Sequence, residues 1–408
     1  MNKNYLSIFV LLGSFIAEAQ VHKTLPKGVR LLAYRNVTTN NIKATYNQTQ
    51  AETPLSYDIN ADSKSLREVS AEIEAYFDYI KAQNPTAYNQ FTLGEFNLSA
   101  QARLNVQGIG TGYGITDRLT VYGILPYYKA EVQMKYKQLK TTNNKKIADD
   151  LYNTAGNDVD ATIANLTGSN IDVNGNLLQS IVVNTFNYEE VGSWQGQGYG
   201  DMEFGAMYNI INRTLWGMSA TFGIVAPTGR VDDPDILQDI GFGDGQWDLF
   251  SEVAAGFSAT NRLTLGSTLR YTYQMPGDRK FRIPYSRDFM LSSDTGNFNV
   301  KFGDKIDATF LGSYQFNDWF SLSPAFDIQY QGKSKFDSVY GSADDYLAQN
   351  SDRMAHIGRL TASVSSIQPF LKKQFLLPAS VNIIVQQTLA GKNVPKVGRF
   401  EVEFRLLF

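Results

Sequence analysis

The chain has 408 residues, a formal net charge of −3 and a mean hydropathy of −0.26. The absence of a basic surplus argues against nucleic acid as a partner, and the absence of cysteine excludes a disulfide scaffold and thiol chemistry. The 23 Tyr, 25 Phe and 33 Gly are typical of a membrane β-barrel, in which only every second residue of a strand meets lipid.

The N-terminus has the pattern of an export signal. Lys3 precedes an apolar run from Tyr5 to Ile16, and Ala17 and Ala19 provide the small residues of a cleavage site. The run is too short to span a bilayer as a helix, which needs about 20 apolar residues. We therefore predict a signal peptide over residues 1–19 and a mature outer-membrane β-barrel over residues 20–408.

Alternating polar and apolar residues recur through the mature chain and predict an all-β fold, a transmembrane antiparallel up-and-down β-barrel of about twelve strands. Odd and even positions of a strand face opposite sides, so one face should meet lipid and the other the lumen. The apolar sets expected to face lipid are those of 96–106, 306–316 and 320–330. The strands are expected near 28–37, 93–109, 119–136, 198–211, 215–228, 247–259, 263–274, 301–316, 319–332, 354–365, 375–390 and 396–408.

Short turns and long connections take alternate places between these strands. Tight turns rich in Asn and Asp are expected at 115–118, 211–214, 259–262 and 316–319, with a longer one near 366–373. In outer-membrane barrels the short turns lie in the periplasm and the long loops outside the cell. The long loops are expected at about 38–92, 138–197, 231–246, 275–298 and 335–353, with a short one near 391–395.

Two loop segments allow alternative interpretations. The segment 63–81 favours a helix with Ser65 as its N-cap and Glu68 as the capping partner, which either folds into the barrel mouth or forms a solvated arm. The stretch 157–176, rich in Asp, Asn, Gly and Thr, fits weak calcium coordination or, with more weight, a flexible polar loop.

Proline and tryptophan add detail to the predicted wall. The apolar phase changes at Pro126, which predicts a bulge or kink. Trp216, Trp247 and Trp319 fall at predicted strand ends, where an aromatic girdle would anchor the barrel.

The last ten residues alternate almost without fault. Phe400, Phe404 and Phe408 share one face with Val402 and Leu406, and charged residues occupy the other. This ending resembles the assembly signal of outer-membrane proteins. It implies the barrel-assembly machinery as a partner, beside outer-membrane lipid, and a pairing of the last strand with the segment near Val29 and Leu31.

The segments 113–127, 198–208, 226–229 and 243–249 together resemble outer-membrane channels of the phenol meta-pathway transporter family, which are related to long-chain fatty-acid channels. The resemblance implies a channel in the outer membrane of a Gram-negative bacterium. One departure is that only about residues 20–26 precede the first strand, which is short for the N-terminal hatch of fatty-acid channels.

No catalytic constellation is evident, because the mature chain has only His22 and His356 and neither has a serine at a hydrolase spacing. No cofactor or metal site is predicted. The candidate functional residues are instead those assigned by parity to the lumen. They are Arg103, Tyr122, Glu203, Phe250, Glu252, Arg270, Asp307, Asp327, Arg359, Arg399, Glu401, Glu403 and Arg405.

These charges can line a permeation path or, as the near balance of their signs favours, pair across neighbouring strands and fill a narrow interior. Tyr122 and Phe250, with Leu311, indicate an apolar stretch of the lumen. The sequence thus favours a passive channel for small solutes, hydrophobic or aromatic ones among them. The alternative is a structural or surface-display barrel with a closed lumen whose loops bind a partner.

Overall fold

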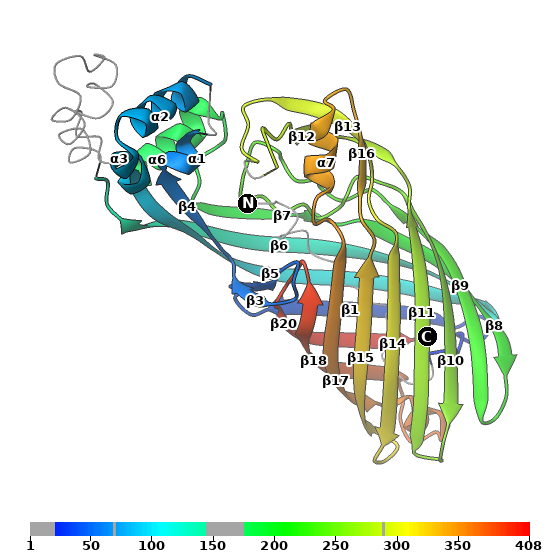
Figure 1. Cartoon of the computed structure of the whole chain (residues 1–408). Coiled ribbons are helices and arrows are strands. Elements are labelled where there is room, and N and C mark those ends of the chain that lie inside the picture. Colours follow the sequence, from blue (N-terminus) through cyan, green and yellow to red (C-terminus); the bar gives the residue numbers. More distant parts are fainter. Residues whose placement is uncertain (1–20, 68–70, 144–174, 288–289) are drawn as a thin grey trace. The chain divides into compact units, whose positions relative to one another are not determined.

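The computed structural model describes residues 21–67, 71–143, 175–287 and 290–408, and it is dominated by long antiparallel strands (Figure 1). Twelve of them form the barrel. These are β1 (Arg30–Thr39), β5 (Thr92–Thr116), β6 (Leu119–Lys140), β8 (Met202–Asn212), β9 (Trp216–Ala226), β10 (Asp248–Ser258), β11 (Leu263–Gln274), β14 (Lys305–Gln315), β15 (Phe320–Gln331), β17 (Arg353–Ser365), β18 (Ala379–Lys392) and β20 (Gly398–Leu407).

Each barrel strand pairs with its neighbours in the chain, and the first and last strands pair with each other. The order runs β5-β1-β20-β18-β17-β15-β14-β11-β10-β9-β8-β6, and the pairing of β5 with β6 closes it. Leu31 lies opposite Leu407, and Arg30 and Phe408 exchange backbone hydrogen bonds of 2.7 and 3.0 Å. The predicted twelve-stranded barrel and its closure through the terminal strand are confirmed.

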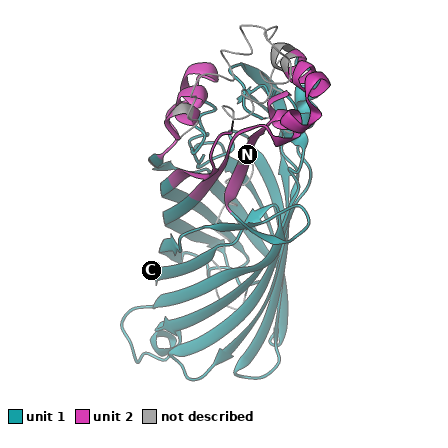
Figure 2. Ribbon diagram, turned by 60° about the vertical axis from the view of Figure 1, so that its left-hand side comes forward, with its two compact units in different colours: residues 1–54, 101–132, 193–408 teal, residues 55–100, 133–192 magenta. Residues whose placement is uncertain are grey.

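Contacts divide the chain into two compact units, coloured separately in Figure 2. Unit 1 comprises residues 1–54, 101–132 and 193–408 and contains the barrel wall. Unit 2 comprises residues 55–100 and 133–192 and includes the first part of β5, residues 92–100, and the last part of β6, residues 133–140.

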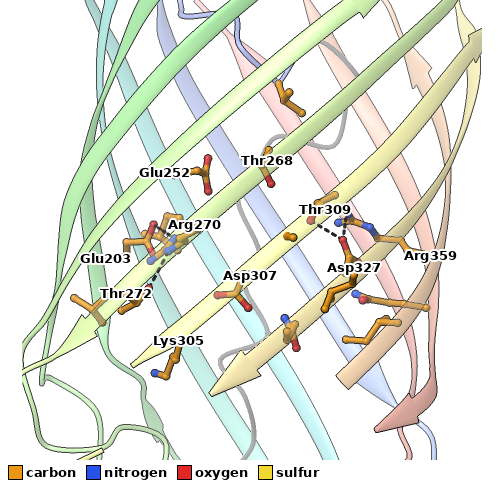
Figure 3. A pocket seen from close by; sticks show the side chains of 18 of the residues that line it. Glu203, Glu252, Thr268, Arg270, Thr272, Lys305, Asp307, Thr309, Asp327 and Arg359 are labelled. Atoms are coloured by element: carbon orange, nitrogen blue, oxygen red, sulfur yellow. Dashed lines mark hydrogen bonds and ion pairs between the residues drawn. The ribbon is translucent and has the colours of Figure 1, made fainter. Parts of the chain in front are cut away.

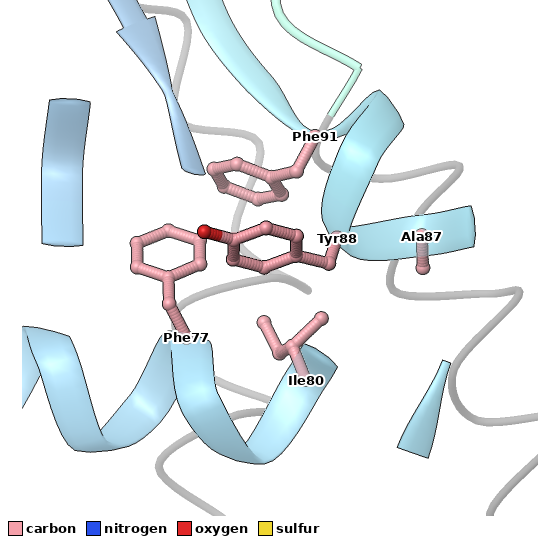
Figure 4. Packing of buried hydrophobic residues seen from close by; sticks show 5 residues of the cluster. All are labelled: Phe77, Ile80, Ala87, Tyr88 and Phe91. Atoms are coloured by element: carbon pink, nitrogen blue, oxygen red, sulfur yellow. The ribbon is translucent and has the colours of Figure 1, made fainter. Parts of the chain in front are cut away.

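Unit 2 contains β4 (Ser56–Asp62), which pairs with β5, and several short helices. The helices are α1 (Ser63–Arg67), α2 (Ala71–Gln83), α3 (Pro85–Gln90), α6 (Gly175–Ser180) and the π-helix η3 (Ile181–Thr185). Figure 4 shows the apolar cluster that joins α2 to α3, in which the Phe77 ring packs edge-on against Tyr88 and Phe91 beside Ile80.

The prediction of a helix at 63–81 agrees with α1 and α2, but the predicted cap is wrong. Asp62 accepts a hydrogen bond of 2.8 Å from the Ser65 backbone N–H, so the cap lies one residue before the first helical residue, Ser63. An Asp side chain bonding the third helical N–H is the usual N-cap arrangement. Ser65 is thus inside the helix and is not its N-cap.

The loops of unit 1 carry their own small sheets. One contains β12 (Gly277–Arg282), β13 (Thr295–Lys301) and β16 (Lys335–Asp337), next to α7 (Ser342–Ala348), and is filled by aromatic rings around Phe298. The other contains β2 (Ala44–Tyr46), β3 (Glu52–Pro54) and β19 (Val394–Pro395). The remaining elements are β7 (Ser193–Tyr199), which pairs with β6, and α8 (Ile367–Leu371) in the longest tight connection.

Most of the predicted strand faces are correct. Phe310, Phe326 and Phe404 are exposed on the outer surface, whereas Asp327 and Glu403 on the same strands are buried. Large apolar residues exposed on barrel strands continue this outer surface around the wall, as lipid-facing positions should. They include Phe222, Leu265, Leu269, Ile306, Val385 and Phe400.

The face predicted for β5 is wrong. Ala102, Leu104 and Val106 are buried and do not face lipid. Val106 lies opposite Val37, two residues along β1 from Arg35, and Arg35 points into the lumen, so these apolar side chains point inward as well. The predicted alternation is present, but the apolar face of this segment meets the interior of the protein and not lipid.

The predicted phase change at Pro126 is also wrong. Ile124, Tyr128, Ala130 and Val132 are all buried, so the same parity points inward on both sides of the proline. The hydrophobicity of the faces changes there and the orientation does not. Pro126 marks a change of partner instead, because β6 pairs with β8 up to Ile124, and the Pro126 carbonyl then accepts a hydrogen bond from Gly200 on the way to β7.

The three predicted girdle tryptophans are at strand ends and partly exposed. Trp216 begins β9, Trp247 directly precedes β10, and Trp319 directly precedes β15.

No described helix is long and apolar enough to cross a membrane. The predicted signal peptide (1–19) and most of the 157–176 stretch lie outside the described residues.

Candidate functional site: a charged cavity in the barrel lumen

A cavity of about 150 Å³ lies inside the barrel and is lined by side chains from strands all around the wall. Figure 3 shows charged and threonine side chains meeting there from β8, β10, β11, β14, β15 and β17. Seven of the predicted lumen residues line it. They are Glu203, Glu252, Arg270, Asp307, Asp327, Arg359 and Arg399.

A row of two aromatic rings and two glycines forms part of the inner wall. Tyr122 on β6 is level with Gly205 on β8, Gly205 with Gly223 on β9, and Gly223 with Phe250 on β10. A Cβ at Gly205 would lie 2.6 Å from the Tyr122 ring, and one at Gly223 would lie 2.2 Å from Phe250. The glycines therefore let both rings lie flat against the wall.

Arg270 crosses this row. Its guanidinium lies 3.6 Å from the centre of the Phe250 ring and reaches Glu203, to which its two terminal nitrogens donate hydrogen bonds of 3.2 and 2.9 Å. The Tyr122 hydroxyl donates to the same carboxylate at 2.9 Å. The bidentate geometry and the ring beneath the cation hold Arg270 in one orientation. Tyr122 and Phe250 thus hold the Arg270–Glu203 ion pair in place and do not by themselves form an apolar passage.

A second network joins the first and last strands. Arg35 on β1 lies opposite Glu403 on β20 and forms ion pairs with Glu403 and, at 3.8 Å, with Glu401. Both carboxylates have further partners, since Gln386 donates to Glu401 and Asn382 and Arg405 donate to Glu403. Glu403 is completely buried. Glu401, Glu403 and Arg405 therefore belong to a hydrogen-bonded network across the closing seam of the barrel and do not line the open cavity.

Two further ion pairs line the same cavity. Asp327 accepts hydrogen bonds from Arg359 at 3.0 Å and from the Thr309 hydroxyl at 2.7 Å. Lys305 lies 3.5 Å from Asp248. Pairing, the outcome given more weight from the sequence, thus applies to most of the predicted charges.

Three charged side chains on the cavity have no ion pair or side-chain hydrogen bond within the described part of the chain. They are Glu252 on β10, Asp307 on β14 and Arg399 on β20. The remaining candidate, Arg103, is exposed on the outer face of β5, because the apolar face of that segment is the inner one. Arg103 is therefore not a lumen residue.

The N-terminal segment enters the lumen despite its shortness. Val21 is buried against Ala254 and Leu311 on the cavity wall. His22 is also buried, and its carbonyl accepts a hydrogen bond of 2.7 Å from Asn209. Residues 24–27 then bond to the turn at Asp117 and to Thr120. These residues fill part of the lumen as a short plug would. His356 lies apart from them, with its ring stacked on Phe326.

Sequence reasoning missed Arg35, the partner of Glu401 and Glu403, and also the short plug. The weak alternation of the first strand gave no assignment for Arg35, although a cation on the strand expected to pair with the four charged residues of the terminal strand was a usable signal. The plug left no signal, since residues 21–26 have no periodicity.

Comparison with known proteins places the fold. No family model matches the chain, and no curated protein matches its sequence. Among solved structures, an outer-membrane channel from Pseudomonas putida F1 is similar over 95% of this chain and 98% of its own, with a TM-score of 0.52 and 15% identity. The toluene transporter TbuX of Ralstonia pickettii gives a TM-score of 0.35 at 10% identity, over 94% of this chain and 90% of its own. The first similarity supports the fold predicted from the sequence, an antiparallel β-barrel.

Proposed function

We propose that this protein is a passive outer-membrane channel for small solutes, hydrophobic or aromatic ones among them. The observation that carries the proposal is the cavity inside a closed barrel, lined from all sides by side chains that leave it unfilled. A purely structural barrel of this width could fill its interior with side chains. The similar fold of a known outer-membrane channel supports the same conclusion.

The solute class follows from the mixed lining. Ile124, Val225, Leu311 and Ile357 provide apolar surface between the charged rows. Small solutes with an apolar body and a polar or charged edge suit such a lining best, because the fixed ion pairs offer hydrogen bonds and the intervening side chains offer dry contact.

The first experiment is single-channel recording in planar bilayers. Thr268 on β11 lines the cavity, and the neighbouring Leu269 points outward. We expect discrete conductance steps from the wild type, a loss of at least half of that conductance in Thr268→Trp, and no change in Leu269→Trp. An absence of steps above background would overturn the channel and favour the display barrel. Swelling of liposomes in neutral aromatic solutes against sugars of similar size then tests the solute class.

We also propose that the terminal strand is the assembly signal read by the barrel-assembly machinery. Its support is the exposed apolar face of Phe400, Phe404 and Phe408 on the strand that closes the barrel. Phe408→Ser should reduce the amount of folded protein in outer membranes, whereas the outward Phe257→Ser should not.

A further inference from the structure

The unpaired carboxylates of the cavity flank a cation that is turned away from them. Glu252, Arg270 and Asp307 are level with one another on three adjacent strands, β10, β11 and β14, and share the inner face. Directly opposed residues have Cβ atoms about 5 Å apart. Arg270 nevertheless bonds to neither neighbour, because its guanidinium lies over Phe250 and binds Glu203. In Figure 3 the Glu252 and Asp307 side chains have no bonded partner.

This arrangement leaves an excess of negative charge in a shielded place. Three carboxylates (Glu203, Glu252 and Asp307) surround one guanidinium, and the neighbouring pairs Asp327–Arg359 and Asp248–Lys305 neutralise themselves. Glu252 is only 7% exposed. A carboxylate so shielded from water is costly unless a counter-charge or hydrogen-bond donor reaches it.

We propose that Glu252 and Asp307 form a binding site for a small monovalent cation and make the lumen cation-selective. The inference rests on the proposed channel function and names the charge of its preferred solutes. A monovalent cation suits the site better than a divalent metal ion, because no group of three or more carboxylate or imidazole side chains among the described residues is placed to coordinate a metal, and divalent ions take six or more oxygen ligands. The unpaired Arg399 lies on β20, far from β11 in the strand order, where it repels cations from the opposite wall.

The test is the reversal potential across planar bilayers in a tenfold KCl gradient. We expect the wild type to prefer K⁺ over Cl⁻, Glu252→Gln with Asp307→Asn to lower that permeability ratio at least about threefold, and Arg399→Gln to raise it. Glu131→Gln removes the same charge from the exposed outer face of β6 and should leave the ratio unchanged. An unchanged ratio in the double variant would overturn the site.

If the wild type does not conduct, the proposed channel function is wrong but the cation site is not yet tested. A second measurement then tests the site directly. The unfolding midpoint in detergent is compared in methylammonium chloride and in tetraethylammonium chloride at equal ionic strength. Bound methylammonium should raise the wild-type midpoint by at least about 1 °C. That rise should persist in Glu131→Gln and vanish in the double variant or, if the double variant does not fold, in Asp307→Asn. Equal wild-type midpoints in the two salts would contradict the proposal.

Discussion

Two parts of the same wall use alternation in opposite ways. On β10, β11 and β14 the outward residues are apolar, such as Val253, Leu269 and Ile306, and the inward ones are charged. On β5 around Leu104 and on β6 around Val132 the inward residues are apolar, and the outward face carries the charged residues Arg103 and Glu131.

The difference shows where the membrane is. A charged side chain facing hydrocarbon is expensive, so the outer face with Arg103 and Glu131 cannot lie in lipid. β5 and β6, at 25 and 22 residues, are also far longer than the 9–11 residues that a tilted strand needs to cross a bilayer. The parts of β5 and β6 that carry Arg103 and Glu131 therefore lie outside the bilayer, and the apolar residues on their inner faces are buried.

The largest expected effect is at Arg35, because β1 joins the two kinds of wall. Arg35→Met leaves Glu401 without its ion-pair partner and Glu403 with Arg405 as its remaining cation, and removal of one partner from a buried pair costs about 3–5 kcal/mol. The free energy of unfolding, from urea titration in detergent or lipid vesicles, measures this cost.

The double variant Arg35→Met with Glu403→Gln should recover part but not all of the loss, because the buried Glu403 charge is removed together with Arg35 while Glu401 and Arg405 still lose their ion-pair partners. A single variant as stable as the wild type would show that the seam does not depend on this network.

A smaller effect tests where lipid ends. Leu269→Arg places a charge on the exposed face of β11 and should cost about 2–4 kcal/mol if that face meets the bilayer core. Glu131→Arg on the outer face of β6 should change the stability by less than about 0.5 kcal/mol, because that face is already in water. Folding into vesicles, followed by tryptophan fluorescence, gives both values. Equal costs at the two positions would mean that both faces meet the same solvent.

The sequence was sufficient for the strands, their number and their pairing, because period-2 alternation and turn residues are local signals. It was also sufficient for the inward charges of β8, β10, β11, β14, β15 and β20. It failed at Arg103 and Pro126, since alternation identifies which residues share a face but not what that face meets. The sequence also could not predict that Arg270 turns toward Glu203, because this orientation depends on Gly205 and Gly223 leaving space for the Tyr122 and Phe250 rings.

The smallest effect concerns the seam where β6 changes partner from β8 to β7. Asp201, directly before β8, accepts hydrogen bonds from the Gly229 and Asp244 backbone N–H groups. Burial, reinforced by the Asp244 carboxylate, raises the pKa of Asp201 to about 6, from about 4 for an unperturbed aspartate. A raised acid pKa means that the folded protein binds more protons than the unfolded chain between these values, so stability should fall as pH rises from about 4 to about 6.

We expect a loss of about 1–2 kcal/mol across this window in the wild type. That loss should disappear in Asp201→Asn and persist in Asp345→Asn, which changes an exposed carboxylate. Urea unfolding at pH 4.5 and pH 7 measures the difference, and a slope unaffected by Asp201→Asn would assign the pH dependence to other groups.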